Sequence, residues 1–269
     1  MGEFLKAVIL GIVEGITEFL PISSTGHLIL MNQFIDFTGD FANLFNIVIQ
    51  LGAILSVVVY FWDRLYPFSR NKTDQQRKDI WQTWIKTIVG VSPAVVIGVL
   101  FADKIEEKLF NSYVVATALV IGGIILIILE RRNKDARFDS VASLTFMTVI
   151  GIGFFQTLAM IPGTSRSAAT IMGAMALGAS RAAAAEFSFF LAIPTMIGAS
   201  TLSLFKSGFN LTTLQWQVLG VGFFVSFVVA WAVIALFMNY IRKNNFKPFA
   251  YYRIVLGTVV LLYFTMVVR

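Results

Sequence analysis

The chain contains no cysteine, which excludes disulfides, thiolate metal ligands and a cysteine nucleophile. It is also poor in charge, since Asp, Glu, Lys and Arg make up 13% of its 269 residues, whereas soluble domains carry about 25%. Hydrophobic residues make up 57%, so polar side chains are too few to cover a water-facing surface. We therefore expect a polytopic membrane protein. The N-terminus has no basic region followed by a small-residue cleavage site, so no removable signal peptide is expected.

Long apolar runs predict the membrane crossings. A helix of about 20 apolar residues crosses a bilayer. Six runs fit this length: Leu44–Trp62, Ile85–Phe101, Tyr113–Leu129, Phe187–Phe205, Trp216–Met238 and Phe249–Val268.

Two other apolar regions, Phe4–Met31 and Val141–Leu177, are each interrupted by a proline followed by small polar residues. Non-helical backbone at membrane depth is tolerated only where it is buried in protein or lines a cavity. We interpret both regions as re-entrant helical hairpins, which enter and leave the membrane on the same side.

The two interruptions resemble each other and indicate an internal repeat. Placing Pro21 on Pro162 also places Ser24 on Ser165, and three apolar runs follow each interruption. Three crossings is an odd number, so the second repeat must be inverted, an arrangement that forms substrate sites near the midplane from discontinuous helices. The predicted fold is an all-α polytopic membrane protein of two inverted repeats, each a re-entrant hairpin plus three transmembrane helices. It is a single membrane domain, residues 1–269, with repeats at 1–135 and 136–269.

The net charge of +6 is interpreted as a topology signal rather than a nucleic-acid footprint, because the basic residues lie in short loops between apolar runs. Alternate loops are rich in Lys and Arg, namely those within residues 63–86, 131–137 and 242–247. The intervening loops, 102–112 and 206–215, are poorer. The positive-inside rule then places the three basic loops in the cytoplasm. The first hairpin would open to the outer, periplasmic face and the second to the cytoplasm.

Two carboxylates precede the first proline. Glu14 and Glu18 are four residues apart, so on a helix they share a face. One interpretation is a pair of interfacial glutamates solvated at a helix end. The other is a divalent-metal site, since ionisable groups in a membrane segment suggest function and carboxylate oxygens suit Mg²⁺ or Ca²⁺.

A run of small polar residues and the only histidine, His27, follow that proline. Hydroxyl and backbone N–H groups at a helix start bind phosphate, although the same residue types commonly cap helices. His27 is either an ordinary hydrogen-bonded side chain or a nucleophile, general acid or general base. Three nucleophiles fit these residues: Ser24 activated by His27, His27 itself, and a metal-bound water. The polar run is Ser23, Ser24, Thr25 and Gly26.

The second interruption adds a cation. Arg166 carries a fixed-charge fork suited to bidentate phosphate binding, and its alternative role is to extend to the membrane interface. Acids, a histidine, hydroxyls and an arginine together are the components of phosphoryl transfer. The chain has no Walker glycine loop, HExxH zinc pair or recognisable Ser-His-Asp pattern. The other candidate phosphate-binding residues of this interruption are Gly163, Ser165, Ser167 and Thr170.

Both interruptions resemble signature regions of one family. Glu14–Leu28 and Pro162–Thr170 resemble the two signatures of the bacitracin-resistance family of undecaprenyl-diphosphate phosphatases. The resemblance continues through Val48–Gly52, Glu186–Phe189 and Pro248–Arg253, so it covers nearly the whole chain. It implies a bacterial inner-membrane enzyme that removes the terminal phosphate from undecaprenyl diphosphate. That reaction regenerates the lipid carrier for cell-wall synthesis and confers bacitracin resistance.

The resemblance also implies roles for individual residues. The acidic motif of the family corresponds to Glu14 and Glu18, its essential histidine to His27, and its second signature to Pro162–Thr170. The resulting assignment has three parts. The catalytic residues are Glu18, Ser24, His27 and Arg166; the metal ligands are Glu14 and Glu18; the substrate-binding residues are Ser23, Thr25, Gly26, Gly163, Ser165, Arg166, Ser167 and Thr170.

The repeat architecture leaves an alternative function. Inverted repeats with broken helices are typical of transporters, so a lipid-phosphate transporter or flippase is the competing hypothesis. A transporter has no need of an acid pair beside a histidine and an arginine, and a purely structural protein leaves the polar interruptions unexplained. The expected partners are undecaprenyl diphosphate and the membrane, with no nucleic acid. The oligomeric state is open, with a homodimer as one option.

Overall fold

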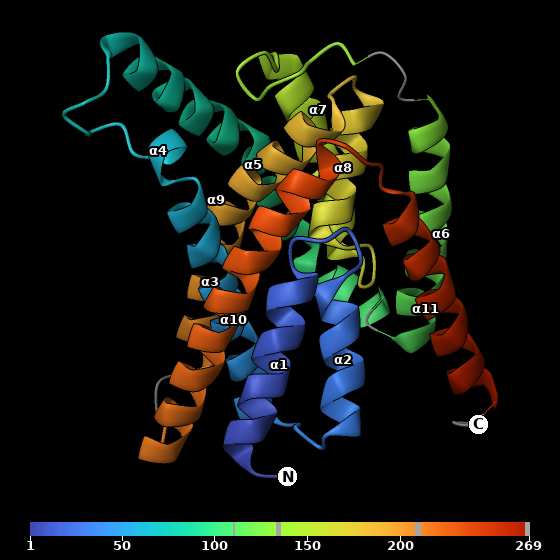
Figure 1. Cartoon of the computed structure of the whole chain (residues 1–269). Helices are drawn as coiled ribbons and strands as arrows, with labels where there is room; N and C mark the ends of the chain where they lie inside the picture. Colours follow the sequence, from blue (N-terminus) through green and yellow to red (C-terminus); the bar gives the residue numbers. More distant parts are fainter. Residues whose placement is uncertain (110, 133–135, 208–210, 267–269) are drawn as a thin grey trace.

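The computed structural model describes residues 1–109, 111–132, 136–207 and 211–266 (Figure 1). This part of the chain is helical and forms no strand, only an isolated bridge between Phe138 and Ala179. The elements are α1 (Glu3–Thr17), α2 (Ser24–Phe34), α3 (Asp40–Tyr60), α4 (Trp62–Leu65), α5 (Asp74–Leu109), α6 (Ser112–Arg132), α7 (Phe146–Thr157), the 3-10 helix η1 (Leu158–Met160), α8 (Arg166–Ala176), α9 (Arg181–Ser207), α10 (Thr213–Ile241) and α11 (Lys247–Met266).

The six predicted crossings are confirmed as α3, α5, α6, α9, α10 and α11, each long and apolar enough to span a bilayer. The predicted end of the last crossing, Val268, lies outside the described residues. The largest difference is at α5, which begins at Asp74 instead of Ile85. Thr73 Oγ1 accepts a hydrogen bond from Gln76 N, and Gln76 Oε1 accepts one from Thr73 N. This capping box starts a polar extension of the helix, which hydropathy alone does not reveal.

The two predicted re-entrant hairpins are confirmed as pairs of short helices, α1 with α2 and α7 with α8. In Figure 1 the turn between α1 and α2 lies near the middle of the molecule, and α1 begins at the lower end. The hairpin of α7 and α8 descends from the upper end, so its turn reaches the same level. The hairpins therefore enter from opposite ends and meet at their turns.

Backbone conformation aligns the two hairpins one residue away from the predicted register. Ser23 and Ser165 are the residues that precede α2 and α8, and both have positive φ, 75° and 73°. Each hydroxyl accepts a hydrogen bond from the backbone N–H three residues later. Ser23 therefore corresponds to Ser165 and Ser24 to Arg166. The predicted match of Ser24 with Ser165 was wrong, because it followed the prolines rather than the shared helix start.

Helix packing is equivalent in the two halves, as expected for inverted repeats. Helix α1 packs on α10, and its counterpart α7 packs on α5; α3 packs on α9, and α6 on α11. Small residues allow close approach at these contacts. A Cβ on Gly15 would lie 2.9 Å from Ser226 O, and one on Gly153 would lie 2.3 Å from Gly90 O. The boundary between the repeats stays a prediction, since residues 133–135 lie outside the described part.

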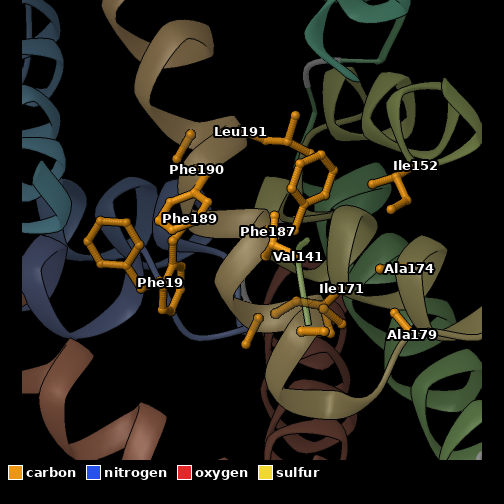
Figure 2. Close-up of a cluster of buried hydrophobic side chains, with 14 of the residues drawn as sticks. Phe19, Val141, Ile152, Ile171, Ala174, Ala179, Phe187, Phe189, Phe190 and Leu191 are labelled. Carbon is orange, nitrogen blue, oxygen red and sulfur yellow. The ribbon is translucent and has the colours of Figure 1, made fainter. Parts of the chain in front are cut away.

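A buried aromatic cluster supports the first turn (Figure 2). Phe19, which lies just after α1 and follows Glu18, packs edge-on against Phe189 of α9 with ring centroids 5.2 Å apart. Phe189 is fully buried, as are Phe187 and Leu191 on either side of it in the same helix. The packing of Phe19 against α9 places the end of α1 beside the second repeat.

The basic connections share one end of the molecule. The connections from α3 to α5 and from α10 to α11 lie at the upper end of Figure 1, as do residues 136–145, which precede α7, and α1 begins at the lower end. Glu130 of α6 connects α9 with the segment before α11 at this end of the molecule. It accepts hydrogen bonds from Arg181 through both carboxylate oxygens and another from the backbone N–H of Phe246. The predicted alternation of basic and poorly charged ends agrees with this arrangement.

Candidate active site

The centre of the site is a carboxylate of the first hairpin. Glu18 follows the last residue of α1, and its helical backbone donates to Glu14 O. Its side chain is 5% exposed. Glu18 Oε2 accepts a hydrogen bond of 2.6 Å from Ser24 Oγ, across the turn of its own hairpin. Glu18 Oε1 accepts one of 3.0 Å from Arg166 Nη2, which belongs to the other hairpin. The Glu18 carboxylate thus contacts two other predicted catalytic residues, Ser24 and Arg166.

Arg166 is the first residue of α8 and is held from two directions. Its Nη1 donates to Ser188 O at 2.8 Å and to Ser188 Oγ at 3.3 Å, while its Nη2 forms the ion pair with Glu18. Thr170 Oγ1 donates to Ser188 Oγ at 2.7 Å. Ser188 therefore fixes both Arg166 and Thr170, and its contacts bring them into one polar cluster.

The two hairpin turns also contact each other directly. Ser167 Oγ donates to Leu20 O at 2.9 Å, and the Ser165 and Ser167 hydroxyls lie 3.0 Å apart. The N-terminal ends of α2 and α8 thus converge on the central cluster. A helix N-terminus has free N–H groups and a positive dipole end, so two such ends favour an anion.

Some predicted site residues lie elsewhere or have another contact. Gly163 has a φ of 89°, and a Cβ there would lie 2.4 Å from Val115 O, so its small size serves packing on α6. Gly26 borders a cavity of about 200 Å³ lined by α2, α6 and α11. Thr25 is exposed.

His27 contacts α11 rather than Ser24. Its Nδ1 lies 2.7 Å from Ser23 O, and its Nε2 lies 2.8 Å from the Tyr252 hydroxyl. A carbonyl oxygen can only accept, so Nδ1 carries the proton, and the Nε2 of the neutral ring accepts from Tyr252. The two rings are stacked with centroids 5.6 Å apart. The Ser24 hydroxyl donates instead to Glu18 Oε2 at 2.6 Å, so a carboxylate rather than His27 is its hydrogen-bond acceptor.

Buried groups without partners indicate what the site binds. Glu14 is fully buried with its side chain within hydrogen-bond reach of Glu18, and no donor group of the described residues reaches its carboxylate oxygens; Arg166 Nε likewise has no acceptor there. Buried polar groups in native proteins are normally paired. A cation would bind the Glu14 oxygens, and a phosphate oxygen would accept from Arg166 Nε. The orphan groups therefore fit a phosphate with a cation.

The donor set fits a cation that needs further ligands. No cluster of three or more His, Cys, Asp or Glu side chains able to hold a metal ion occurs in the described part of the chain. Glu18 already receives two hydrogen bonds, which leaves Glu14 as the freer ligand. Mg²⁺ is typically held by one or two carboxylates and completes its shell with water and phosphate oxygens. Glu14 and Glu18 fit that kind of binding.

Sequence reasoning did not assign site roles to Ser188, Tyr252 and Arg253. All three lie in stretches that carry the family resemblance, which was the only signal available. Arg253 is fully buried and donates to the carbonyl oxygens of Pro21 and Gly163, one in each hairpin turn. A buried serine in an apolar helix and an aromatic residue at a helix surface carry no distinctive pattern by themselves.

This fold and cluster define a multi-pass membrane protein with a buried acid, hydroxyl and guanidinium site between two inverted hairpins. Residues 7–259 match the family described as bacitracin resistance protein BacA, and the chain belongs to that family. It is 55% identical over 264 residues to undecaprenyl-diphosphatase 1 of Clostridioides difficile, covering 97% of this chain and 96% of that protein. It is 51% identical over 273 residues to undecaprenyl-diphosphatase of Limosilactobacillus fermentum, covering 99% of each.

Proposed function

We propose that this protein is a membrane phosphatase that hydrolyses undecaprenyl diphosphate to undecaprenyl phosphate and inorganic phosphate. The observation that carries the proposal is Glu18, which accepts hydrogen bonds from Ser24 of its own hairpin and Arg166 of the other. The names of the relatives supply the lipid identity. The reaction recycles the lipid carrier for cell-wall synthesis and so underlies resistance to bacitracin.

We assign the nucleophile to Ser24. Its hydroxyl donates to Glu18 Oε2 at 2.6 Å, so Glu18 can accept the proton as Ser24 Oγ attacks the terminal phosphorus. The bond between that phosphorus and the bridging oxygen breaks, and undecaprenyl phosphate leaves. A water then hydrolyses the phosphoserine and releases inorganic phosphate. His27, whose ring is held by Ser23 O and the Tyr252 hydroxyl, lies beside the first turn, where it can donate a proton to the departing phosphate or accept one from the water that hydrolyses the phosphoserine.

Arg166 stabilises charge on the transferring phosphoryl group. Phosphoryl transfer depends mainly on positioning and on neutralising the equatorial oxygens. The unpartnered Nε is available to one of these oxygens, while Ser188 holds Nη1 in place. Ser165, Ser167 and Thr170 complete the anion-binding end of α8, and the start of α2 faces it.

We assign a divalent cation, Mg²⁺ or Ca²⁺, to Glu14 and Glu18. When bound, it shields the negative charge of the diphosphate. The unpartnered oxygens of Glu14 support this assignment.

The lipid tail would leave the site beside α2. The cavity of about 200 Å³ next to Gly26 is lined mainly by apolar side chains of α2, α6 and α11. It suits the isoprene units nearest the diphosphate, and the remainder of the chain would lie in the bilayer. Ile29→Trp, which narrows this cavity, is expected to raise KM for undecaprenyl diphosphate.

The deciding experiment is phosphate release from undecaprenyl diphosphate by detergent-solubilised protein, where transport between compartments is impossible. Wild-type protein should release phosphate, Ser24→Ala should lose nearly all activity, and a phosphoserine should be trapped in an acid quench of the wild type. Gly220→Ala is the matched control, since a Cβ at Gly220 meets no atom within 4 Å. Absence of phosphate release from folded wild-type protein would instead favour the transporter hypothesis, which the inverted repeats support. Residual turnover in Ser24→Ala would favour direct attack by water.

We place the protein in the bacterial inner membrane with the site open to the outer face. Lys- and Arg-rich connections at one end support this orientation through the positive-inside rule. The chain has no cysteine, and two exposed threonines can report access: Thr25 lies by the turn of the first hairpin, and Thr73 directly precedes α5. Thr25→Cys should react with an impermeant maleimide added to intact cells, and Thr73→Cys only after the membrane is opened. The reverse result would invert the orientation. A homodimer stays a prediction, and the site does not depend on it.

A further inference from the structure

Arg253 is a buried cation whose hydrogen bonds go to backbone carbonyls. The side chain lies within α11 and is 0% exposed. Its Nε donates to Leu119 O at 3.4 Å, and its Nη2 donates to Ala118 O at 3.2 Å. No salt bridge joins it to a carboxylate in the described ranges of the chain. A buried guanidinium without a carboxylate partner is energetically costly. Its presence is therefore explained if it holds those carbonyls in place.

The remaining two hydrogen bonds reach both hairpin turns. Nη1 donates to Pro21 O at 3.2 Å, and Nη2 donates to Gly163 O at 3.3 Å. Pro21 and Gly163 occupy equivalent positions, since each lies two residues before the positive-φ serine that precedes α2 or α8. The two terminal nitrogens of the Arg253 guanidinium therefore bind equivalent carbonyls, one from each inverted repeat. This arrangement matches the approximate two-fold relation between the hairpins.

The neighbouring helix makes room for this fork. A Cβ on Gly122 of α6 would lie 2.3 Å from Arg253 Nη2 and 3.0 Å from its Cζ. The adjacent Gly123 lets α6 approach α11, because a Cβ there would lie 2.7 Å from Ala250 O. The absence of side chains at these two positions leaves the guanidinium space to reach both turns.

We infer that Arg253 is a positioning residue, which sets the distance between the two half-sites by holding the Pro21 and Gly163 carbonyls on one rigid group. Ser24 begins α2 and Arg166 begins α8, each shortly after a carbonyl that Arg253 binds. The hydrogen bonds of Arg253 in the described residues go to backbone carbonyls and not to either of these side chains. Its effect on activity rests on the proposed phosphatase function, whereas its effect on the spacing of the turns does not.

Variants that keep or remove the charge separate this role from charge compensation. Arg253→Lys keeps a cation but has no planar fork to span two carbonyls, and Arg253→Met removes the charge. A misplacement of about 1 Å at a catalytic centre can lower turnover by about 100-fold. Both variants should therefore lower kcat by about 10- to 100-fold with a much smaller change in KM. Gly122→Ala should do the same by displacing the guanidinium, and Gly220→Ala should not.

A second measurement reports the spacing without activity. Ser167 Oγ donates to the backbone carbonyl of Leu20 across the two turns, and the chain contains no cysteine. In protein carrying Leu20→Cys and Ser167→Cys, oxidation should form a disulfide, measured by mass spectrometry. Adding Arg253→Met should slow its formation, and adding Gly220→Ala should leave the rate unchanged.

Wild-type kcat in folded Arg253→Lys would overturn the inference, as would an unchanged disulfide rate with Arg253→Met. Folding of each variant is checked by gel filtration and by the melting temperature. If wild-type protein releases no phosphate, the proposed function fails, and the disulfide measurement still decides the role of Arg253.

Discussion

Replacement of Arg166 by lysine tests the centre of the proposed mechanism. The substitution keeps the positive charge but replaces a fork of donors by one ammonium group. Arg166 uses Nη2 for Glu18 and Nη1 for Ser188, and its Nε is free for a phosphate oxygen. A single lysine nitrogen cannot keep Ser188 and Glu18 and also replace the free donor.

The size of the effect follows from the bonds that are lost. A hydrogen bond to a charged group contributes about 1.5–3 kcal/mol, and about 1.4 kcal/mol changes a rate tenfold. Loss of one such bond to the transferring phosphoryl group should lower kcat by about 10- to 100-fold. KM should change less, because the charge that attracts the diphosphate is retained.

Initial rates of phosphate release over a range of undecaprenyl diphosphate concentrations measure both constants. Arg77→Lys is the control, because Arg77 pairs at 3.7 Å with an Asp74 side chain that is 93% exposed, and exposed pairs contribute little. Ser188→Ala should also lower kcat, and combining it with Arg166→Lys should cost less than the product of the two effects, since both act on one group. Unchanged kinetics in Arg166→Lys would show that Arg166 is only a structural cation.

Three further substitutions test separate parts of the structure. Glu14→Gln should shift the Mg²⁺ dependence of activity to higher concentration, measured by titration after chelation; superimposable titrations would remove the metal role of Glu14. Tyr252→Phe removes a hydrogen bond of about 0.5–1.5 kcal/mol from His27, so kcat should fall by about two- to tenfold, and the same change in a His27→Ala background should have no further effect. Gly52→Ala would place a Cβ 2.4 Å from a carbonyl oxygen of α10, an overpacking that costs about 1–3 kcal/mol; its melting temperature should fall while that of Gly220→Ala stays at the wild-type value.

Much of the fold could be predicted from the sequence, because a membrane imposes strong constraints on composition. A hydrocarbon layer requires long apolar helices, so the six crossings are readable from hydropathy alone. The small polar residues that follow Pro21 and Pro162 are conspicuous for the same reason, because they interrupt apolar segments. The polar start of α5 could not be found in this way, since its helix continues outside the apolar region.

The site was predictable in its residue types but not in its pairings. Glu18 and Arg166 are charged and therefore rare in apolar surroundings, Ser24 lies in a run of polar residues, and the structure brings the three together. Which base faces Ser24 depends on side-chain directions around the turn, and sequence spacing does not determine those. Ser188 is a small residue within an apolar helix, where a serine is indistinguishable by sequence from an ordinary packing residue. The register of the repeats depended on backbone conformation at two serines rather than on the more visible prolines.

The corrected register has a consequence for how such a site could arise. Positions that correspond in the two hairpins hold different side chains, since Ser24 matches Arg166 and Glu14 matches Gln156. Two identical subunits in an antiparallel pair would have to present the same group from both sides, serine against serine or arginine against arginine. Joining two copies in one polypeptide removes that restriction. After a gene duplication, each repeat can lose a functional side chain that the other repeat keeps. An acid and a cation can then face each other across an axis that was once symmetric.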